Sequence, residues 1–181
     1  MIDAKAAKVK LLLFDVDGVL TDGKILLHPD GTESKQFDIK DGSAIRWAQY
    51  VGLTVGFLSA RTSATTGVRA QQLGVTLLHQ GVDAKLDSYD QIIDSLLLED
   101  EQVAYMGDDL LDLPVLMRVG LSAAPADAAD AVRARVDLVT SARGGDGAAR
   151  ELVVRVLRAQ GHWDALLAGY MVVESQAGRR G

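Results

Sequence analysis

The fold of this chain is decided by the stretch VKLLLFDVDG, residues 9–18. It opens with an apolar run, interrupted only by Lys10, of the length expected for a buried strand. The run ends in Asp15 and Asp17, and ligands of open parallel sheets bind at the carboxyl ends of strands. Taken alone, such an acid pair more often solvates a loop, because short motifs match frequently by accident.

Similar apolar runs recur along the chain and alternate with helical patterns. Further strands are expected at residues 53–58, 75–79, 103–106, 121–124 and 136–139. Apolar residues at helical spacing predict helices over 41–51, 63–73, 82–96 and 149–157. This alternation predicts an α/β fold with a mostly parallel sheet and helices on both of its faces.

One segment, residues 23–39, breaks the alternation. The stretches 24–28 and 32–39 flank the turn signal Pro29-Asp30-Gly31, which predicts a β-hairpin just after the first strand. A hairpin this small should pack on something, either over the site or against copies of itself. Residues 1–181 are expected to form one domain without a large cap, and the tail at 141–181 includes a stretch, 161–181, with no assignable role.

Composition narrows the functional classes. A formal net charge of -6 argues against a general nucleic-acid surface, and the absence of Cys excludes disulfides and thiolate metal sites. No apolar run approaches the roughly 20 residues needed to span a bilayer, and the N-terminus lacks the apolar stretch of a signal peptide. We therefore expect a cytoplasmic protein with no membrane partner.

Reactive groups follow the next strands as well. Ser59 and Lys85 come after the second and third strands, where a turn hydroxyl and a solvated lysine are the commoner explanations for each taken singly. The fourth strand runs into Asp108, Asp109 and Asp112, although an acidic helix start would explain the last two. Clustered carboxylates are costly without a cation, and oxygen ligands indicate Mg²⁺.

The order of these groups suits phosphoryl transfer to a carboxylate. Such a reaction needs a nucleophile in line with phosphorus, positive charge on the equatorial oxygens, and a second acid for the leaving alkoxide. A signalling receiver domain fits less well, because its phosphorylated acid follows the third strand, which here ends in His79-Gln80-Gly81. The pattern of a P-loop is absent, and Gly145-x-Gly147 lacks the third glycine of a dinucleotide site.

These motifs, in this order, resemble the haloacid dehalogenase superfamily of phosphatases. Within it the resemblance is closest to the capless branch that acts on 3-deoxy-D-manno-octulosonate 8-phosphate. The resemblance runs from about residue 11 to residue 157. It rests on FDVDGVLTDG at 14–23, KQF at 35–37, RTS at 61–63, AYMGDD at 104–109 and the branch-specific tail GGDGAARE at 144–151.

The resemblance implies roles for the residues at the strand ends. Asp15 would be the nucleophile and Asp17 the general acid and base. Asp15, the main-chain carbonyl of Asp17, and Asp108 would bind Mg²⁺. Ser59 and Lys85 would hold the phosphoryl group.

Outer positions follow from the same resemblance. Asp109 and Asp112 would orient Lys85 or metal-bound water, and Arg61 and Arg69 would lie near the sugar acid. The tail favours 3-deoxy-D-manno-octulosonate 8-phosphate as substrate, with a nonulosonate 9-phosphate or a catalytically silent relative as alternatives. The branch implies a homotetramer joined through its hairpins, in which a neighbour's tail helps close each site.

Overall fold

The centre of the fold is a six-stranded sheet in the order β5-β4-β1-β6-β7-β8, and all its neighbouring strands are parallel. The computed structural model describes residues 1–177, with side chains in the last helix as far as Met171. The strands of the sheet are β1 (Leu11–Phe14), β4 (Thr54–Ser59), β5 (Leu77–Gln80), β6 (Val103–Met106), β7 (Leu121–Ala124) and β8 (Leu138–Val139). The α/β fold with a parallel sheet is therefore confirmed.

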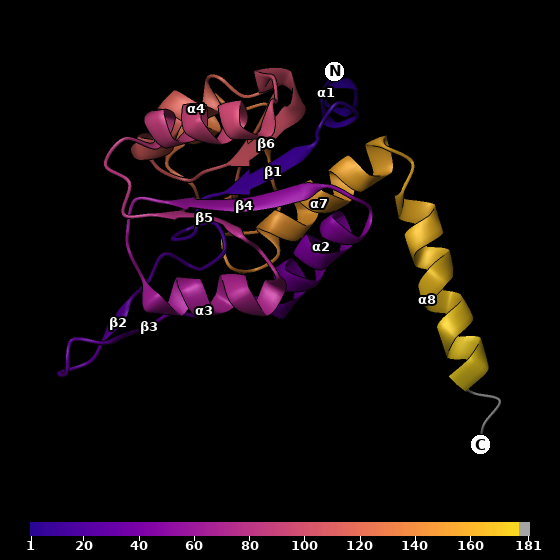
Figure 1. Cartoon of the computed structure of the whole chain (residues 1–181), viewed down its shortest axis with the longest axis horizontal. Coiled ribbons are helices and arrows are strands. Elements are labelled where there is room, and N and C mark those ends of the chain that lie inside the picture. Colours follow the sequence, from indigo (N-terminus) through magenta and orange to yellow (C-terminus); the bar gives the residue numbers. More distant parts are fainter. Residues whose placement is uncertain (178–181) are drawn as a thin grey trace.

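Helices cover both faces of this sheet (Figure 1). One face carries α1 (Ile2–Ala6), α2 (Ile39–Tyr50), α3 (Ala64–Leu73) and α7 (Ala148–Ala159). The other carries α4 (Lys85–Leu96), α5 (Leu113–Leu116) and α6 (Asp130–Arg133). Two short 3-10 helices, η1 (Asp100–Gln102) and η2 (Leu110–Asp112), flank β6.

Strand β1 is buried on both faces, which explains its unbroken apolar sequence. Leu12 and Phe14 belong to the core under α2 and α7, whereas Leu11 and Leu13 belong to the core under α4. All four side chains have no exposed surface. Burying each contributes roughly 1.5–3 kcal/mol, so the central strand is anchored from both sides.

The hairpin is shorter than the sequence predicts. Only β2 (Leu26–Leu27) and β3 (Glu33–Ser34) pair, in antiparallel register, and they extend away from the sheet (Figure 1). The expected strand at 32–39 is wrong at its end, because Asp38 accepts a hydrogen bond from the backbone of Lys40 and caps α2. Helix α2 consequently begins at Ile39 rather than at residue 41.

The segment with no assignable role begins with α8 (Trp163–Ala177), while residues 178–181 lie outside the described part. This helix runs away from the sheet (Figure 1). Its start is held by Trp47, whose ring lies edge-on to Trp163 at 5.8 Å and whose Nε1 donates to Tyr170 Oη at 2.9 Å. Among the described residues, no helix combines the length and apolarity that crossing a membrane requires.

Candidate active site

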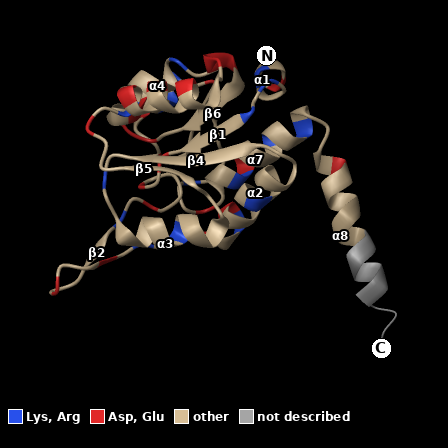
Figure 2. Cartoon of the chain, in the orientation of Figure 1, with Lys and Arg blue, Asp and Glu red and all other residues tan. Residues whose placement is uncertain are grey.

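The parallel register brings three strand ends to one edge of the sheet. Phe14 in β1 pairs with Phe57 in β4 and with Met106 in β6. Asp15 and Asp108 follow these strands within two residues, and Ser59 is the last residue of β4. Basic and acidic residues are interspersed over the surrounding helices rather than gathered by sign (Figure 2).

Three carboxylates and a lysine meet at this edge. Ligand atoms of Asp15, Asp108 and Asp112 all lie within 4.8 Å of one another. The buried Nζ of Lys85 lies 2.8 Å from Asp15 Oδ1 and 2.5 Å from Asp112 Oδ1. Asp112 thus contacts Lys85, the residue that it is predicted to orient.

Asp112 also shapes the loop that carries the other acids. Its Oδ2 accepts hydrogen bonds from the backbone N–H of Asp108 at 2.9 Å and of Asp109 at 3.1 Å. The hydroxyl of Tyr105 donates to Asp112 Oδ1 at 2.5 Å and lies 3.3 Å from Lys85 Nζ. Sequence reasoning missed Tyr105, although a tyrosine in a fully buried strand signals a hidden partner for its hydroxyl.

Burial and mutual repulsion disfavour the ionised carboxylates of this cluster, which favours the binding of a cation. Burial, followed by the charge of Asp112, raises the pKa of Asp15 to about 6. Burial and the charges of Asp15 and Asp112 raise the pKa of Asp108 to about 8. Burial alone would lower the pKa of Lys85, but Asp15 and Asp112 outweigh it and raise that pKa.

The donor set fits a hard divalent cation such as Mg²⁺. Asp108 Oδ1 is buried and accepts no hydrogen bond from the described residues. One lysine cannot neutralise three carboxylates, and the cluster contains only oxygen ligands, which Mg²⁺ prefers over the nitrogen and sulfur sites typical of Zn²⁺. Asp15 and Asp108 could therefore hold the metal.

The side chain of Asp17 contacts residues outside this cluster. Lys35 Nζ lies 2.7 Å from Asp17 Oδ1, and Arg61 Nε lies 3.7 Å from Asp17 Oδ2. Ser59 is buried, and its hydroxyl accepts the backbone N–H of Arg61 at 3.3 Å. The structure thus joins Asp17, Ser59 and Arg61 at the rim of the same edge.

Asp109 and Arg69 lie farther out. Asp109 is exposed, and its carboxylate accepts the backbone N–H of Leu110 at 2.7 Å, so it caps η2 instead of contacting Lys85. Arg69 donates to the main-chain oxygen of Asp38 at 3.0 Å, and its guanidinium lies 5.7 Å from the centroid of the Phe37 ring. Arg69 therefore supports the base of the hairpin, and burial lowers its pKa.

The glycines of the tail motif pack against the loop after β1 of their own chain. A Cβ on Gly144 would lie 1.8 Å from the main-chain oxygen of Gly18, so only glycine fits against the loop that follows Asp17. Asp41 accepts the backbone N–H groups of Gly147 and Arg150 and thereby caps α7. Burial raises the pKa of Asp41 to about 6.

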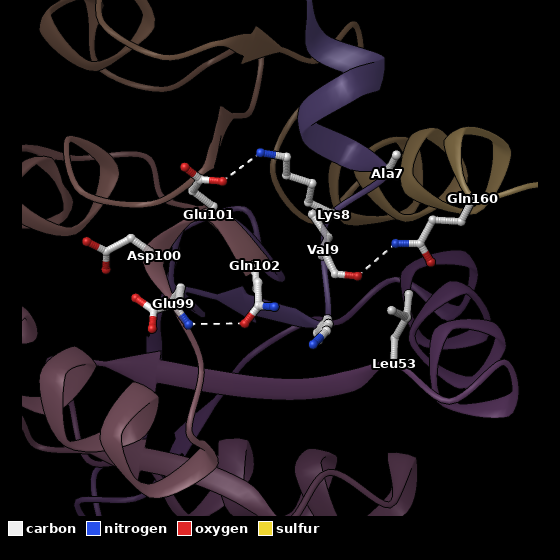
Figure 3. Close-up of a pocket in the computed structure, with 10 residues that line it drawn as sticks. Ala7, Lys8, Val9, Leu53, Glu99, Asp100, Glu101, Gln102 and Gln160 are labelled. Atoms are coloured by element: carbon white, nitrogen blue, oxygen red, sulfur yellow. Dashed lines mark hydrogen bonds and ion pairs between the residues drawn. The ribbon is translucent and has the colours of Figure 1, made fainter.

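A cavity of about 780 Å³ lies at the opposite end of the sheet (Figure 3). Residues that precede β1, β4 and β6 line it. Their polar groups satisfy one another: Lys8 Nζ donates to Glu101 at 2.6 Å, and Gln160 donates to the oxygen of Val9 at 2.7 Å. This cavity is separate from the cluster of Asp15, Asp108 and Asp112, and none of the predicted site residues lines it.

Comparisons with known proteins agree with this geometry. A family model for haloacid dehalogenase-like hydrolases matches residues 57–152. The chain is 43% identical over 161 residues to the 3-deoxy-D-manno-octulosonate 8-phosphate phosphatase KdsC of Escherichia coli K12. These aligned residues make up 89% of this chain and 86% of the relative. The crystal structure of the phosphatase of that name from Yersinia pestis matches with a TM-score of 0.89 and 40% identity, over 90% of this chain and 88% of that one.

A second solved structure carries ligands. The 3-deoxy-D-manno-octulosonate 8-phosphate phosphatase from Moraxella catarrhalis, in complex with a magnesium ion, a phosphate ion and a KDO molecule, matches with a TM-score of 0.91 and 36% identity. The match covers 93% of this chain and 97% of that chain.

Proposed function

The chain belongs to the haloacid dehalogenase-like hydrolase family, and we propose that it is a Mg²⁺-dependent phosphatase that hydrolyses 3-deoxy-D-manno-octulosonate 8-phosphate. The observation that carries this proposal is the meeting of Asp15, Asp108 and Lys85 at the carboxyl edge of the sheet. A nucleophile, a cation site and a fixed ammonium are the parts that phosphoryl transfer requires.

In the first half of the reaction, a carboxylate oxygen of Asp15 attacks phosphorus. The bond between phosphorus and the sugar oxygen breaks, its electron pair leaves with that oxygen, and Asp17 donates a proton to give the free alcohol. Lys85 and Ser59 hold the phosphoryl oxygens. Lys85 is well suited to this because it stays charged, as its raised pKa requires.

In the second half, water attacks the phosphorus of the aspartyl-phosphate. Asp17, now a carboxylate, takes a proton from that water, and the bond between phosphorus and Asp15 breaks to release phosphate. Asp17 ends protonated, as it began. When bound by Asp15, Asp108 and the main-chain carbonyl of Asp17, Mg²⁺ supplies the positive charge that offsets the phosphoryl oxygens.

Two observations favour a sugar-acid substrate. A relative 43% identical to this chain is named for 3-deoxy-D-manno-octulosonate 8-phosphate, and a KDO molecule is bound in one solved structure. In this chain Arg61, half of whose side chain is exposed at the rim beside Asp17, is the cation that we propose to contact the leaving group. Arg69 would act indirectly, through the hairpin.

The test is release of phosphate from a panel of sugar phosphates with Mg²⁺. We expect kcat/KM to be highest for 3-deoxy-D-manno-octulosonate 8-phosphate. A higher value for a nonulosonate 9-phosphate would transfer the proposal to that substrate, and no release from any member would indicate a catalytically silent relative. Hexose phosphates serve as controls because they offer the phosphate without the acid.

We further propose that copies of this chain form a homotetramer through their hairpins. Leu26 and Leu27 are 63% and 71% exposed on a strand pair with open edges, an arrangement that favours self-association. Light scattering should give the mass of four chains. A double substitution, Leu26→Lys with Leu27→Lys, should lower that mass, and an unchanged mass would place the interface elsewhere.

A further inference from the structure

One cationic side chain next to the hairpin, that of Lys35, lies in the candidate site. Lys35 directly follows β3, and its side chain has no exposed surface, although β3 itself lies in an open strand pair. Its Nζ lies 2.7 Å from Asp17 Oδ1 and donates a hydrogen bond to Oδ2 at 2.9 Å. We propose that Lys35 is a positioning residue that holds the carboxylate of Asp17 for its proton transfer from water, in the second half of the reaction.

The burial of Lys35 indicates that this contact is specific. An ammonium group is expensive to remove from water unless a carboxylate meets it, and lysine is almost never fully buried without such a partner. The carboxylates within ion-pair distance of Lys35 are those of Asp17 and, at 3.7 Å, Glu33. Asp17 is the nearer, and both of its oxygens face the same ammonium.

A second ion pair, between Glu33 and Arg61, lies next to the pair of Lys35 and Asp17. Glu33 Oε2 lies 3.0 Å from Arg61 Nη2, and Arg61 Nε lies 3.7 Å from Asp17 Oδ2. The two acids and two bases therefore alternate in sign, so that neither cation is crowded by the other. Lys35 is the buried member, whereas Arg61 stays half-exposed and available to a leaving group.

Positioning matters for Asp17 because of its place in the chain. It lies in the loop that turns at Gly18, whose φ of +93° is a conformation that glycine adopts readily and other residues rarely do. A base that must take a proton from the attacking water needs a fixed rotamer, and a misplacement of about 1 Å can cost about 100-fold in rate. Two contacts from a buried lysine provide that restraint.

This inference rests on the proposed phosphatase reaction, and its test separates the two steps of that reaction. The substrate is p-nitrophenyl phosphate, whose leaving group departs without a proton. Formation of the aspartyl-phosphate then needs no acid, but its hydrolysis still needs Asp17 as base. Stopped-flow absorbance resolves the two steps as a burst of nitrophenolate followed by steady turnover.

We expect Lys35→Met to show a burst at close to the wild-type rate of phosphoenzyme formation. Steady turnover should then be slower by about 10–100-fold. Lys35→Arg, which keeps the charge, should recover much of that turnover. Lys24→Met is the matched control, because Lys24 lies in the same segment with its side chain 86% exposed and should behave as wild type. If the Met variant does not fold, Lys35→Gln replaces it.

A double substitution tests whether Lys35 acts through Asp17. In an Asp17→Asn background, Lys35→Met should leave the residual hydrolysis rate unchanged. An additional loss there, or a variant that slows the burst and the steady rate equally, would mean that Lys35 only docks the hairpin and would overturn the inference. Wild-type turnover in Lys35→Met would overturn it as well, whereas a wild-type protein that releases no phosphate would instead refute the proposed function.

Discussion

Replacement of Asp15 by Asn should stabilise the metal-free protein while abolishing its turnover. Burial raises the pKa of Asp15 from its ordinary 3.8 to about 6. A carboxyl with a raised pKa contributes stability that is complete below its unfolded value and is lost as the pH rises through its folded value. At 1.36 kcal/mol for each pH unit, the ionised Asp15 side chain costs about 3 kcal/mol at pH 7.5. Asn carries no charge and avoids that cost.

The assay is urea unfolding of wild type and Asp15→Asn in EDTA at pH 7.5 and at pH 4. We expect the variant to exceed the wild type by up to about 3 kcal/mol at pH 7.5 and by little at pH 4. Saturating Mg²⁺ should reverse this order, because binding to the native state stabilises the protein that keeps its ligand. Measurable phosphate release by the variant would refute the role of Asp15. A variant less stable than wild type in EDTA at pH 7.5 would refute the electrostatic reasoning.

Three further outcomes are expected. Because the pKa of Asp108 is about 8, Mg²⁺ must displace a proton, so its apparent Kd by calorimetry should fall up to about tenfold per pH unit between pH 6 and 8; a Kd independent of pH would contradict this. Gly144→Ala should cost about 1–3 kcal/mol and most of the activity, because its Cβ would collide with the main chain of Gly18, whereas Gly67→Ala on α3 meets nothing closer than 4.0 Å and should be tolerated. As the pH rises from 4 to 7, the free energy of unfolding of Asp41→Asn in urea should increase relative to that of wild type by up to about 3 kcal/mol, because burial raises the pKa of Asp41 to about 6. A difference that does not depend on pH would show that the hydrogen bonds by which Asp41 caps α7 dominate.

The sequence was most informative where one strand ends in one reactive group. Runs such as 9–14 and 103–106 mark buried strands, and a parallel sheet brings their carboxyl ends together, so the approach of Asp15 to Asp108 and Lys85 could be predicted without coordinates. This reasoning uses only local pattern and sheet topology.

Contacts that depend on rotamers and on tertiary packing could not be found in this way. Lys35 and Tyr105 reach their partners from a hairpin and from the middle of a strand, and no spacing rule connects them to Asp17 or Asp112. The length of the hairpin was wrong because a single side chain, Asp38, stops the extended chain by capping the next helix. The glycines at 144 and 145 are visible in the sequence, but their close approach to the chain's own backbone is decided by packing alone.

The central place of β1 in the sheet also determines when the protein can become active during its synthesis. β1 leaves the ribosome early, yet its two neighbours are β4 and β6, and the latter begins only at Val103. Until then at least one edge of a wholly apolar strand lacks its partner, a state prone to aggregation and to capture by chaperones. The glycine loop at 144–145, which packs on the turn after Asp17, is synthesised later still. A nascent chain that stalls before this loop would therefore carry the nucleophile but no working site.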